Sequence, residues 1–184
     1  MNNTLSAFLE ILKYTLPAII VLIACSSIVK KFLLNDFKEK HLALLKDNQD
    51  TTVRLRLQAY ERLTLYIERI HPRNLIPRVY ESGMTVAHLQ AMLIMTIKME
   101  FEHNVSQQVY VTKQVWSSVR GAKEQEMNMI HMICQQLDPQ ASGKELHKKI
   151  TDYLLTVDGQ LPSDVALNLI NEEARLVLSY GSQA

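Results

Sequence analysis

Two pairs of glutamate and histidine, each separated by two residues, are the side chains in this sequence best suited to chemistry. Glu68 pairs in this way with His71, and Glu100 pairs with His103. On a helix this spacing places both side chains on one face, and di-iron helical bundles use such pairs as metal ligands. Further carboxylates are present at Glu61, Glu124 and Glu126. One interpretation of the pattern is therefore a carboxylate-bridged metal site in a helical bundle.

The same four residues also have a purely structural interpretation, which we favour. Both pairs lie at the expected C-terminal ends of helices, where a histidine complements the helix dipole. His71 directly precedes Pro72, and a helix end that stops at a proline is a poor place for a rigid metal ligand. We therefore predict neither a metal nor a cofactor.

A wider set of polar residues surrounds the second pair and the helix-forming segment before it. Its members are Arg56, Gln58, Glu61, Arg62, Glu100, His103, Asn104, Gln107 and Gln108. If these groups face a bundle interior they must be hydrogen-bonded, because an unpaired buried polar group costs roughly 1–3 kcal/mol. The set then predicts a buried Arg–Glu–His network that joins two helices. If the groups face solvent, the set predicts a surface patch that recognises a protein partner.

Methionines cluster in two helix-forming segments. They are Met92, Met95 and Met99 in one segment, and Met127, Met129 and Met132, beside His131, in the other. Their spacing of two to four residues favours core packing, in which methionine fills irregular gaps. Two alternatives stay open, namely an adaptable groove for a partner helix and a Cu(I) site made of thioethers and a histidine.

Composition excludes several classes of enzyme and binding protein. The chain has 184 residues, with 20 basic and 19 acidic side chains, and a net charge of +1 gives no whole-chain argument for nucleic-acid binding. Its 5 glycines form no phosphate-binding motif, and there is no nucleophile elbow and no zincin motif. The two cysteines, Cys25 and Cys134, cannot build a disulfide framework. These features predict a non-enzymatic protein.

An uncharged segment near the N-terminus predicts a membrane anchor. Residues 14–29 carry no charge and span roughly 24 Å as a helix, against roughly 30 Å for a hydrocarbon core, and apolar residues extend them on both sides. Lysines are more numerous after the segment, so the positive-inside rule predicts a bacterial inner-membrane protein with its N-terminus outside and its C-terminal domain in the cytoplasm. The lysines expected near anionic lipid headgroups are Lys30, Lys31, Lys38 and Lys40.

Three other interpretations of the apolar segment stay open. A cleaved signal peptide would begin with a basic region, whereas the charged residues before the segment are Glu10 and Lys13. The run from Leu22 to Cys25 resembles a bacterial lipobox, which would make the chain a periplasm-facing lipoprotein lipidated at Cys25. The third interpretation is a buried helix of a globular protein.

The rest of the sequence predicts an all-α fold, in which an antiparallel helical bundle follows a single transmembrane helix. We expect a transmembrane anchor at 1–34, a juxtamembrane helix at 35–50 and a cytosolic helical domain at 51–184. The polar residues 47–50 should interrupt the helix, Thr51 or Thr52 should cap the next one, and Pro72 should end it.

Further capping residues and helix breakers predict the remaining boundaries. Thr85 and Thr112 are expected caps, and Ser142 with Glu145 is typical of a capping box. Asp158 with Gly159 should end the helix that this box begins. The segments expected outside the helices are a loop at 72–84 and a connector at 105–111, and the expected helices are 85–104, 112–137, 142–157 and 162–178.

Two motifs give the chain a resemblance to a known family. Residues 56–63 read RLQAYERL, and residues 100–108 read EFEHNVSQQ. Over most of its length, and more weakly after about residue 135, the chain resembles short single-pass inner-membrane proteins of Bacteroidota. The resemblance implies a bacterial cytoplasmic membrane and a cytosolic helical domain, and it assigns no activity and no site residues.

The anchor, the helical domain and the lack of a catalytic motif together predict a membrane-anchored scaffold or adaptor. Its expected partner is another protein or a second copy of the chain. The alternatives are a helical-bundle metalloprotein with Glu and His ligands, and a lipoprotein lipidated at Cys25.

Overall fold

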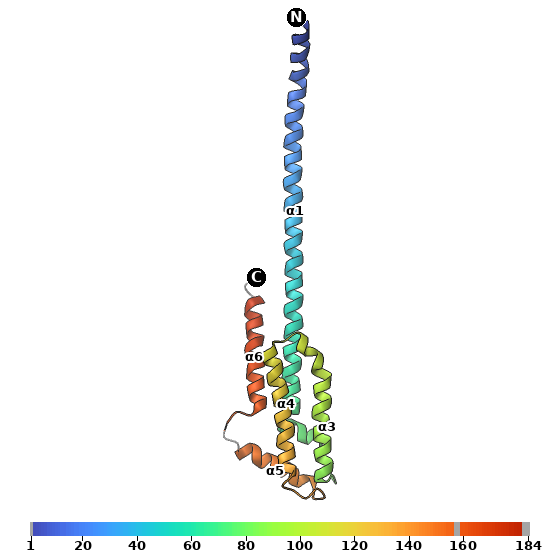
Figure 1. Cartoon of the computed structure of the whole chain (residues 1–184), viewed down its shortest axis with the longest axis vertical. Coiled ribbons are helices and arrows are strands. Elements are labelled where there is room, and N and C mark those ends of the chain that lie inside the picture. Colours follow the sequence, from blue (N-terminus) through green and yellow to red (C-terminus); the bar gives the residue numbers. More distant parts are fainter. Residues whose placement is uncertain (1, 157–158, 182–184) are drawn as a thin grey trace. The chain divides into compact units, whose positions relative to one another are not determined.

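The computed structural model describes residues 2–156 and 159–181, and this part of the chain is built from helices (Figure 1). Within these ranges it forms six α-helices and one short 3₁₀ helix, η1, and it contains no strand. The bounds are α1 (Asn2–Ile70), α2 (Pro72–Val79), α3 (Val86–Asn104), η1 (Val105–Val109), α4 (Lys113–Cys134), α5 (Gly143–Thr156) and α6 (Pro162–Gly181). The predicted all-α fold is confirmed.

Helix α1 contains the apolar segment and continues without a break through the polar residues 47–50. The predicted interruption there, and the predicted cap at Thr51 or Thr52, are therefore wrong. Residues 47–52 include no proline and no glycine, and all six are exposed, where polar side chains cost a helix little. The chain nevertheless divides into two compact units, residues 1–49 and 50–184, whose boundary falls within α1.

By length and composition, α1 is able to cross a membrane. No residue of its most apolar 18-residue window is buried, so this window does not have the packing of a core helix in a globular protein. Cys25 is exposed and free. An apolar helix near an N-terminus is typical both of a membrane anchor and of a signal sequence.

Helix boundaries in residues 51–184 mostly fall where the capping residues predict them. The Oγ1 atom of Thr85 accepts a hydrogen bond from the main chain of α3, and that of Thr112 accepts one from the main chain of α4, each at 3.2 Å. Ser142 Oγ accepts from Lys144 N at 3.3 Å, so it caps α5 at the second helical position. Helix α4 ends three residues before the predicted residue 137, and α6 continues three residues beyond the predicted 178. The predicted stop at Asp158 lies outside the described residues.

The segment predicted as a loop at 72–84 instead contains α2. Pro72 occupies the first position of this helix, where its fixed φ favours the helix and its missing N–H is not needed. His71 is the N-cap, because its Nδ1 accepts a hydrogen bond from Arg73 N at 3.2 Å. Leu75 and Ile76 are buried, so tertiary packing stabilises the short helix. The same proline thus ends α1 and begins α2.

The core of the second unit lies between the C-terminal part of α1 and helices α3, α4 and α6. Helix α4 packs against both α3 and α6, and α2 and α5 pack against α3 and against each other (Figure 1). Apolar residues at helical spacing supply the buried faces, as Leu63 and Ile67 do in α1 and Leu93 and Ile97 do in α3. The burial of these faces holds the walls of the candidate site in place.

Main-chain hydrogen bonds join the beginnings of α3 and α5. Val86 N donates to Ala141 O at 2.9 Å, and Gly143 N donates to Met84 O at 2.8 Å. A Cβ atom at Gly143 would lie 3.0 Å from the Met84 carbonyl oxygen, which is too close for an ordinary contact. The two backbones therefore approach closely because residue 143 is a glycine.

Candidate functional site

An open groove of about 770 Å³ lies between α1 and α3 in the second unit. It is lined by Gln58, Glu61, Arg62, Leu65, Tyr66 and Arg69 of α1, and by Thr96, Met99, Glu100, His103 and Asn104 of α3. Six of the nine residues in the predicted polar set belong to this lining. The groove is therefore where the structure brings most of the predicted residues together.

Helical spacing explains why these side chains share the groove. On α1 the lining positions 58, 62, 65 and 69 recur every three or four residues, next to the buried stripe that includes Leu63 and Ile67. On α3 the lining positions 96, 99, 100, 103 and 104 recur in the same way. Each helix thus buries one stripe in the core and presents the neighbouring stripe to the groove.

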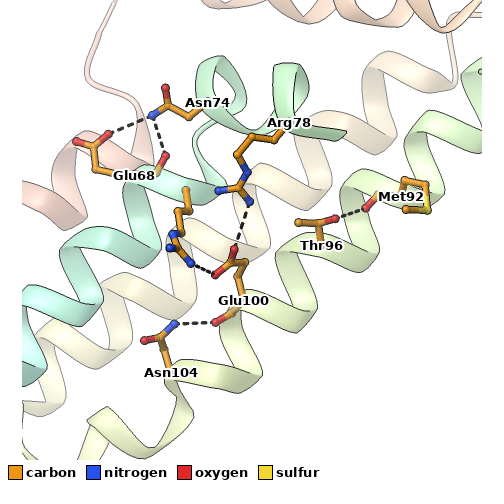
Figure 2. A network of polar contacts seen from close by, with 8 residues as sticks. Glu68, Asn74, Arg78, Met92, Thr96, Glu100 and Asn104 are labelled. Carbon is orange, nitrogen blue, oxygen red and sulfur yellow. Dashed lines mark hydrogen bonds and ion pairs between the residues drawn. The ribbon is translucent and has the colours of Figure 1, made fainter. Parts of the chain in front are cut away.

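Glu100 is the central charged residue of the groove and connects three helices (Figure 2). Its Oε2 accepts from Arg69 Nη1 of α1 at 3.3 Å, and its Oε1 accepts from Arg78 Nη2 of α2 at 3.2 Å. Its main-chain carbonyl accepts from Asn104 Nδ2 at 2.8 Å. The Glu100 side chain is only 17% exposed, so this two-armed ion pair is better shielded from solvent than an ordinary surface pair.

Tyr66 lines the groove and belongs to a row of aromatic rings that continues away from it. The Tyr66 ring lies 6.0 Å from the Phe101 ring, which lies 5.3 Å from the Trp116 ring of α4, and Lys123 Nζ is 4.3 Å from the Phe101 centroid. The Tyr66 hydroxyl is buried and has no hydrogen-bond partner in the described part of the chain. Burial, assisted by the negative charge of Glu100, raises the pKa of Tyr66 strongly, so this residue stays a neutral phenol.

The four candidate metal ligands do not converge. Glu68 accepts a hydrogen bond from Asn74 Nδ2 at 3.3 Å (Figure 2). His71 caps α2, so both residues are committed at the α1–α2 junction. Glu100 binds two arginines, and His103 is exposed at the groove. Within residues 2–156 and 159–181, no three His, Cys, Asp or Glu side chains are grouped closely enough to hold a metal ion. The geometry therefore gives the metal interpretation no support.

The other three members of the polar set lie outside the groove. Arg56 donates from Nη2 to the Tyr60 hydroxyl at 3.1 Å, in a part-buried contact. Gln107 is buried in η1, and Gln108 next to it is exposed. Arg56 and Glu100 thus belong to separate clusters, and the single Arg–Glu–His network considered from the sequence is not formed.

A second polar cluster, which the sequence analysis missed, is centred on Glu173 of α6. Its Oε2 accepts from the Tyr60 hydroxyl at 3.0 Å, and its Oε1 accepts from Thr112 Oγ1 at 2.6 Å. Burial raises the pKa of Tyr60, which therefore acts as a donor to Glu173. The cluster joins α1, α4 and α6 through residues as far apart as 113 positions, and no local pattern signals such a contact.

The methionine clusters divide between the core and the surface. Met129 is buried, as core packing predicts, whereas Met95 and Met99 are 55% and 47% exposed. His131 is engaged with Gln90, whose Nε2 lies 2.8 Å from its Nδ1. Of these residues, Met99 lines the α1–α3 groove.

The groove also includes residues that the polar set omitted, namely Leu65, Tyr66, Arg69, Thr96 and Met99. The sequence could have indicated these residues through their spacing from Arg62 and Glu100, since positions three or four residues apart share a helix face. A set defined by polar residues cannot contain Leu65 or Met99, and Arg69 and Thr96 share the groove only through their helical register.

Comparison with known proteins gives a family and no function. A family model described as a family of unknown function, DUF7935, matches residues 6–177, and the chain belongs to this family. No curated protein and no solved structure matches the chain significantly. The expectation of a family without an assigned activity agrees with this match.

Proposed function

We propose that this family member is a membrane-anchored, non-enzymatic adaptor whose α1–α3 groove binds a helix of a protein partner. In this proposal residues 1–34 are the anchor in a bacterial inner membrane, and the second unit faces the cytoplasm. The lysines that follow the apolar segment support this orientation through the positive-inside rule, and Lys30 and Lys31 would lie near anionic headgroups.

The observation that carries the proposal is the pair of exposed apolar side chains inside a polar groove. Leu65 of α1 is 52% exposed and Met99 of α3 is 47% exposed, and both line the groove. Along α1, Leu65 lies between Arg62 and Arg69 on the same face. An apolar strip bordered by polar groups is typical of a site that receives an amphipathic helix, and methionine adapts its shape to such a partner.

The groove also offers charges to a partner. Arg69 is already paired with Glu100, whereas Glu61 and Arg62 form no ion pair with any residue in the described ranges. Since both are exposed, a partner helix that carries one basic and one acidic residue beside its apolar face can pair with them. Charge thus selects the register of the partner, and the apolar strip supplies most of the affinity.

The same residues are poorly placed for catalysis. The Thr96 hydroxyl donates to the Met92 carbonyl at 2.8 Å, so it is held within its own helix (Figure 2). Both oxygens of the Glu100 carboxylate are occupied by guanidinium groups, so neither is free to accept a proton from a substrate. This arrangement supports a binding role for the groove.

Site-specific photocrosslinking in native membranes tests the groove. A photoreactive residue would replace Leu65 or Met99 in the full chain, and Leu155 of α5, which is 75% exposed, is the matched control position. We expect the same crosslinked partner from positions 65 and 99, none from position 155, and loss of the crosslink in an Arg62→Glu background. Equal crosslinking from position 155, or none from the groove, would contradict the proposal.

Topology is tested separately. Reporter fusions at the C-terminus should be active in the cytoplasm and inactive in the periplasm, and the protein should keep its full-length mass. A diacylglyceryl addition at Cys25 that disappears in a Cys25→Ala variant would instead establish the lipoprotein.

A further inference from the structure

A separate cavity of about 230 Å³ lies where α4, α5 and the start of α6 come together. Most of its wall is apolar and consists of Met129, Met132, Tyr153, Leu161 and Pro162. Polar groups are supplied by Gln125, Glu126 and Asn128. None of these residues lines the α1–α3 groove, so the cavity is independent of the adaptor function.

Glu126 is the exceptional residue of this wall, because it is only 3% exposed and no described residue forms an ion pair with it. The nearby Ser163 is fully buried at the start of α6, and its hydroxyl has no hydrogen-bond partner. This hydroxyl partly offsets the rise in the pKa of Glu126, but the two groups do not meet in hydrogen-bonding geometry. A buried hydroxyl without a hydrogen-bond partner thus lies near a buried carboxyl without an ion pair, an arrangement that native structures rarely tolerate.

The electrostatic surroundings of Glu126 are acidic. Burial raises the pKa of its carboxyl to about 7, and the negative charge of Asp164 on α6 adds to the rise. The charge of Glu126 contributes to the raised pKa of Tyr66 on α1, after burial and the charges of Glu100 and Glu124, and Tyr153 is the titratable residue that α5 contributes to the cavity. No lysine or arginine lines the cavity, so the protein itself supplies no cation to this carboxyl.

We propose that this cavity binds a small organic ammonium ion, with the charged head on Glu126 and a short apolar chain among Met129, Met132 and Leu161. An ammonium group donates hydrogen bonds and carries a positive charge, so it satisfies the Glu126 carboxylate, which lines the cavity. It also relieves the repulsion between Glu126 and Asp164, and the Tyr153 ring favours a cation.

The walls of the cavity select this chemical class over a bare metal ion. Calcium and magnesium require several oxygen ligands, whereas the carboxylate that this cavity offers is that of Glu126 alone. The volume of about 230 Å³ corresponds to about eight groups of the size of a water molecule, at roughly 30 Å³ each. A primary amine with a short alkyl chain matches both the size of the cavity and its single charge.

Ammonium binding must displace the proton that Glu126 holds at mildly acidic pH. Binding therefore releases a proton at pH 6 and becomes tighter as the pH rises to 8, since an alkylamine stays protonated throughout this range. An uncharged alcohol of the same length shows neither effect. Proton release and the pH dependence of affinity therefore distinguish binding of a charged group at Glu126 from binding that only fills an apolar cavity.

Calorimetric titration of the full-length chain in lipid nanodiscs tests the proposal, with n-butylammonium as the probe and empty nanodiscs subtracted. We expect n-butylammonium to bind more tightly than n-butanol at pH 8, and we expect Glu126→Gln to weaken its binding by at least about tenfold. At pH 6, titration in two buffers of different ionisation enthalpy should reveal the released proton.

The control variant is Glu124→Gln, because Glu124 lies on the same helix and is exposed. It should bind the probe as the wild type does. Equal binding of n-butanol, unchanged binding by Glu126→Gln, or no binding by the wild type would each overturn the proposal. The variant is expected to fold, since it removes a buried charge, and these outcomes leave the adaptor proposal untouched.

Discussion

The buried Glu126 carboxyl makes the stability of the second unit depend on pH. Burial raises its pKa to about 7, above the value of 4.5 expected in the unfolded chain. Because the folded pKa is the higher one, the stabilisation is complete below about pH 4.5 and is lost as the pH rises through 7. A difference of about 2.5 pKa units, at 1.36 kcal/mol each, amounts to about 3 kcal/mol of lost stability above pH 8.

A Glu126→Gln variant removes this titration while keeping the size of the side chain. We expect the variant to gain stability relative to the wild type by about 2 kcal/mol between pH 5 and pH 8, because only the wild type must bury a charge at the higher pH. Urea unfolding of the full-length chain in detergent measures the difference. Trp116, the single tryptophan, reports the transition from its position against Phe101.

The comparison between the two proteins isolates this carboxyl, because every other titrating group is common to both. Glu124→Gln, on the exposed side of the same helix, should follow the wild type at each pH. Wild-type and Glu126→Gln curves that stay parallel from pH 5 to pH 8 would show that the carboxyl is hydrated or paired in solution, and the reasoning from its burial would fail.

Three further substitutions test the packing of the bundle through urea unfolding at pH 7. Tyr66→Phe removes a buried hydroxyl that has no partner, so stability should stay unchanged or rise by up to about 1 kcal/mol, and a clear loss would reveal a partner in solution. Glu100→Gln weakens two arginine contacts and should cost about 1–2 kcal/mol, whereas the exposed Glu102→Gln should cost little, and equal effects would discount the ion pairs. Glu173→Gln replaces two hydrogen bonds to a carboxylate and should cost about 1–2 kcal/mol, and an unchanged midpoint would contradict its part in joining α1, α4 and α6.

Capping residues in the sequence correctly predict where α3 and α4 begin, whereas the polar residues 47–50 wrongly predict a break in α1. Thr85 and Thr112 cap α3 and α4 because a threonine side chain can accept a bond from the main chain three residues later, which is a property of four consecutive residues. The polar run at 47–50 has no such property. It lacks proline and glycine, and polarity alone does not end a helix whose surface is exposed.

The contents of the groove were predictable only in part. Arg62, Glu100 and His103 are recognisable as polar positions at helical spacing, and the structure places all three in the groove. The pairing of Glu100 with Arg69 and Arg78 depends on which helices face each other, and periodicity within one helix does not encode that choice. Burial of Glu126 likewise follows from the approach of α6, far along the chain.

The junction between the beginnings of α3 and α5 is made by peptide groups, through the bonds from Val86 to Ala141 and from Gly143 to Met84. Peptide groups are common to all amino acids, so these bonds do not depend on the partly buried side chains of Met84 and Ala141, whereas the Val86 side chain is buried in the core. The exception is position 143, where any side chain would push against a carbonyl oxygen. Substitution at Met84 or Ala141 should therefore leave this joint intact, whereas a side chain at position 143 should force the two helix beginnings apart.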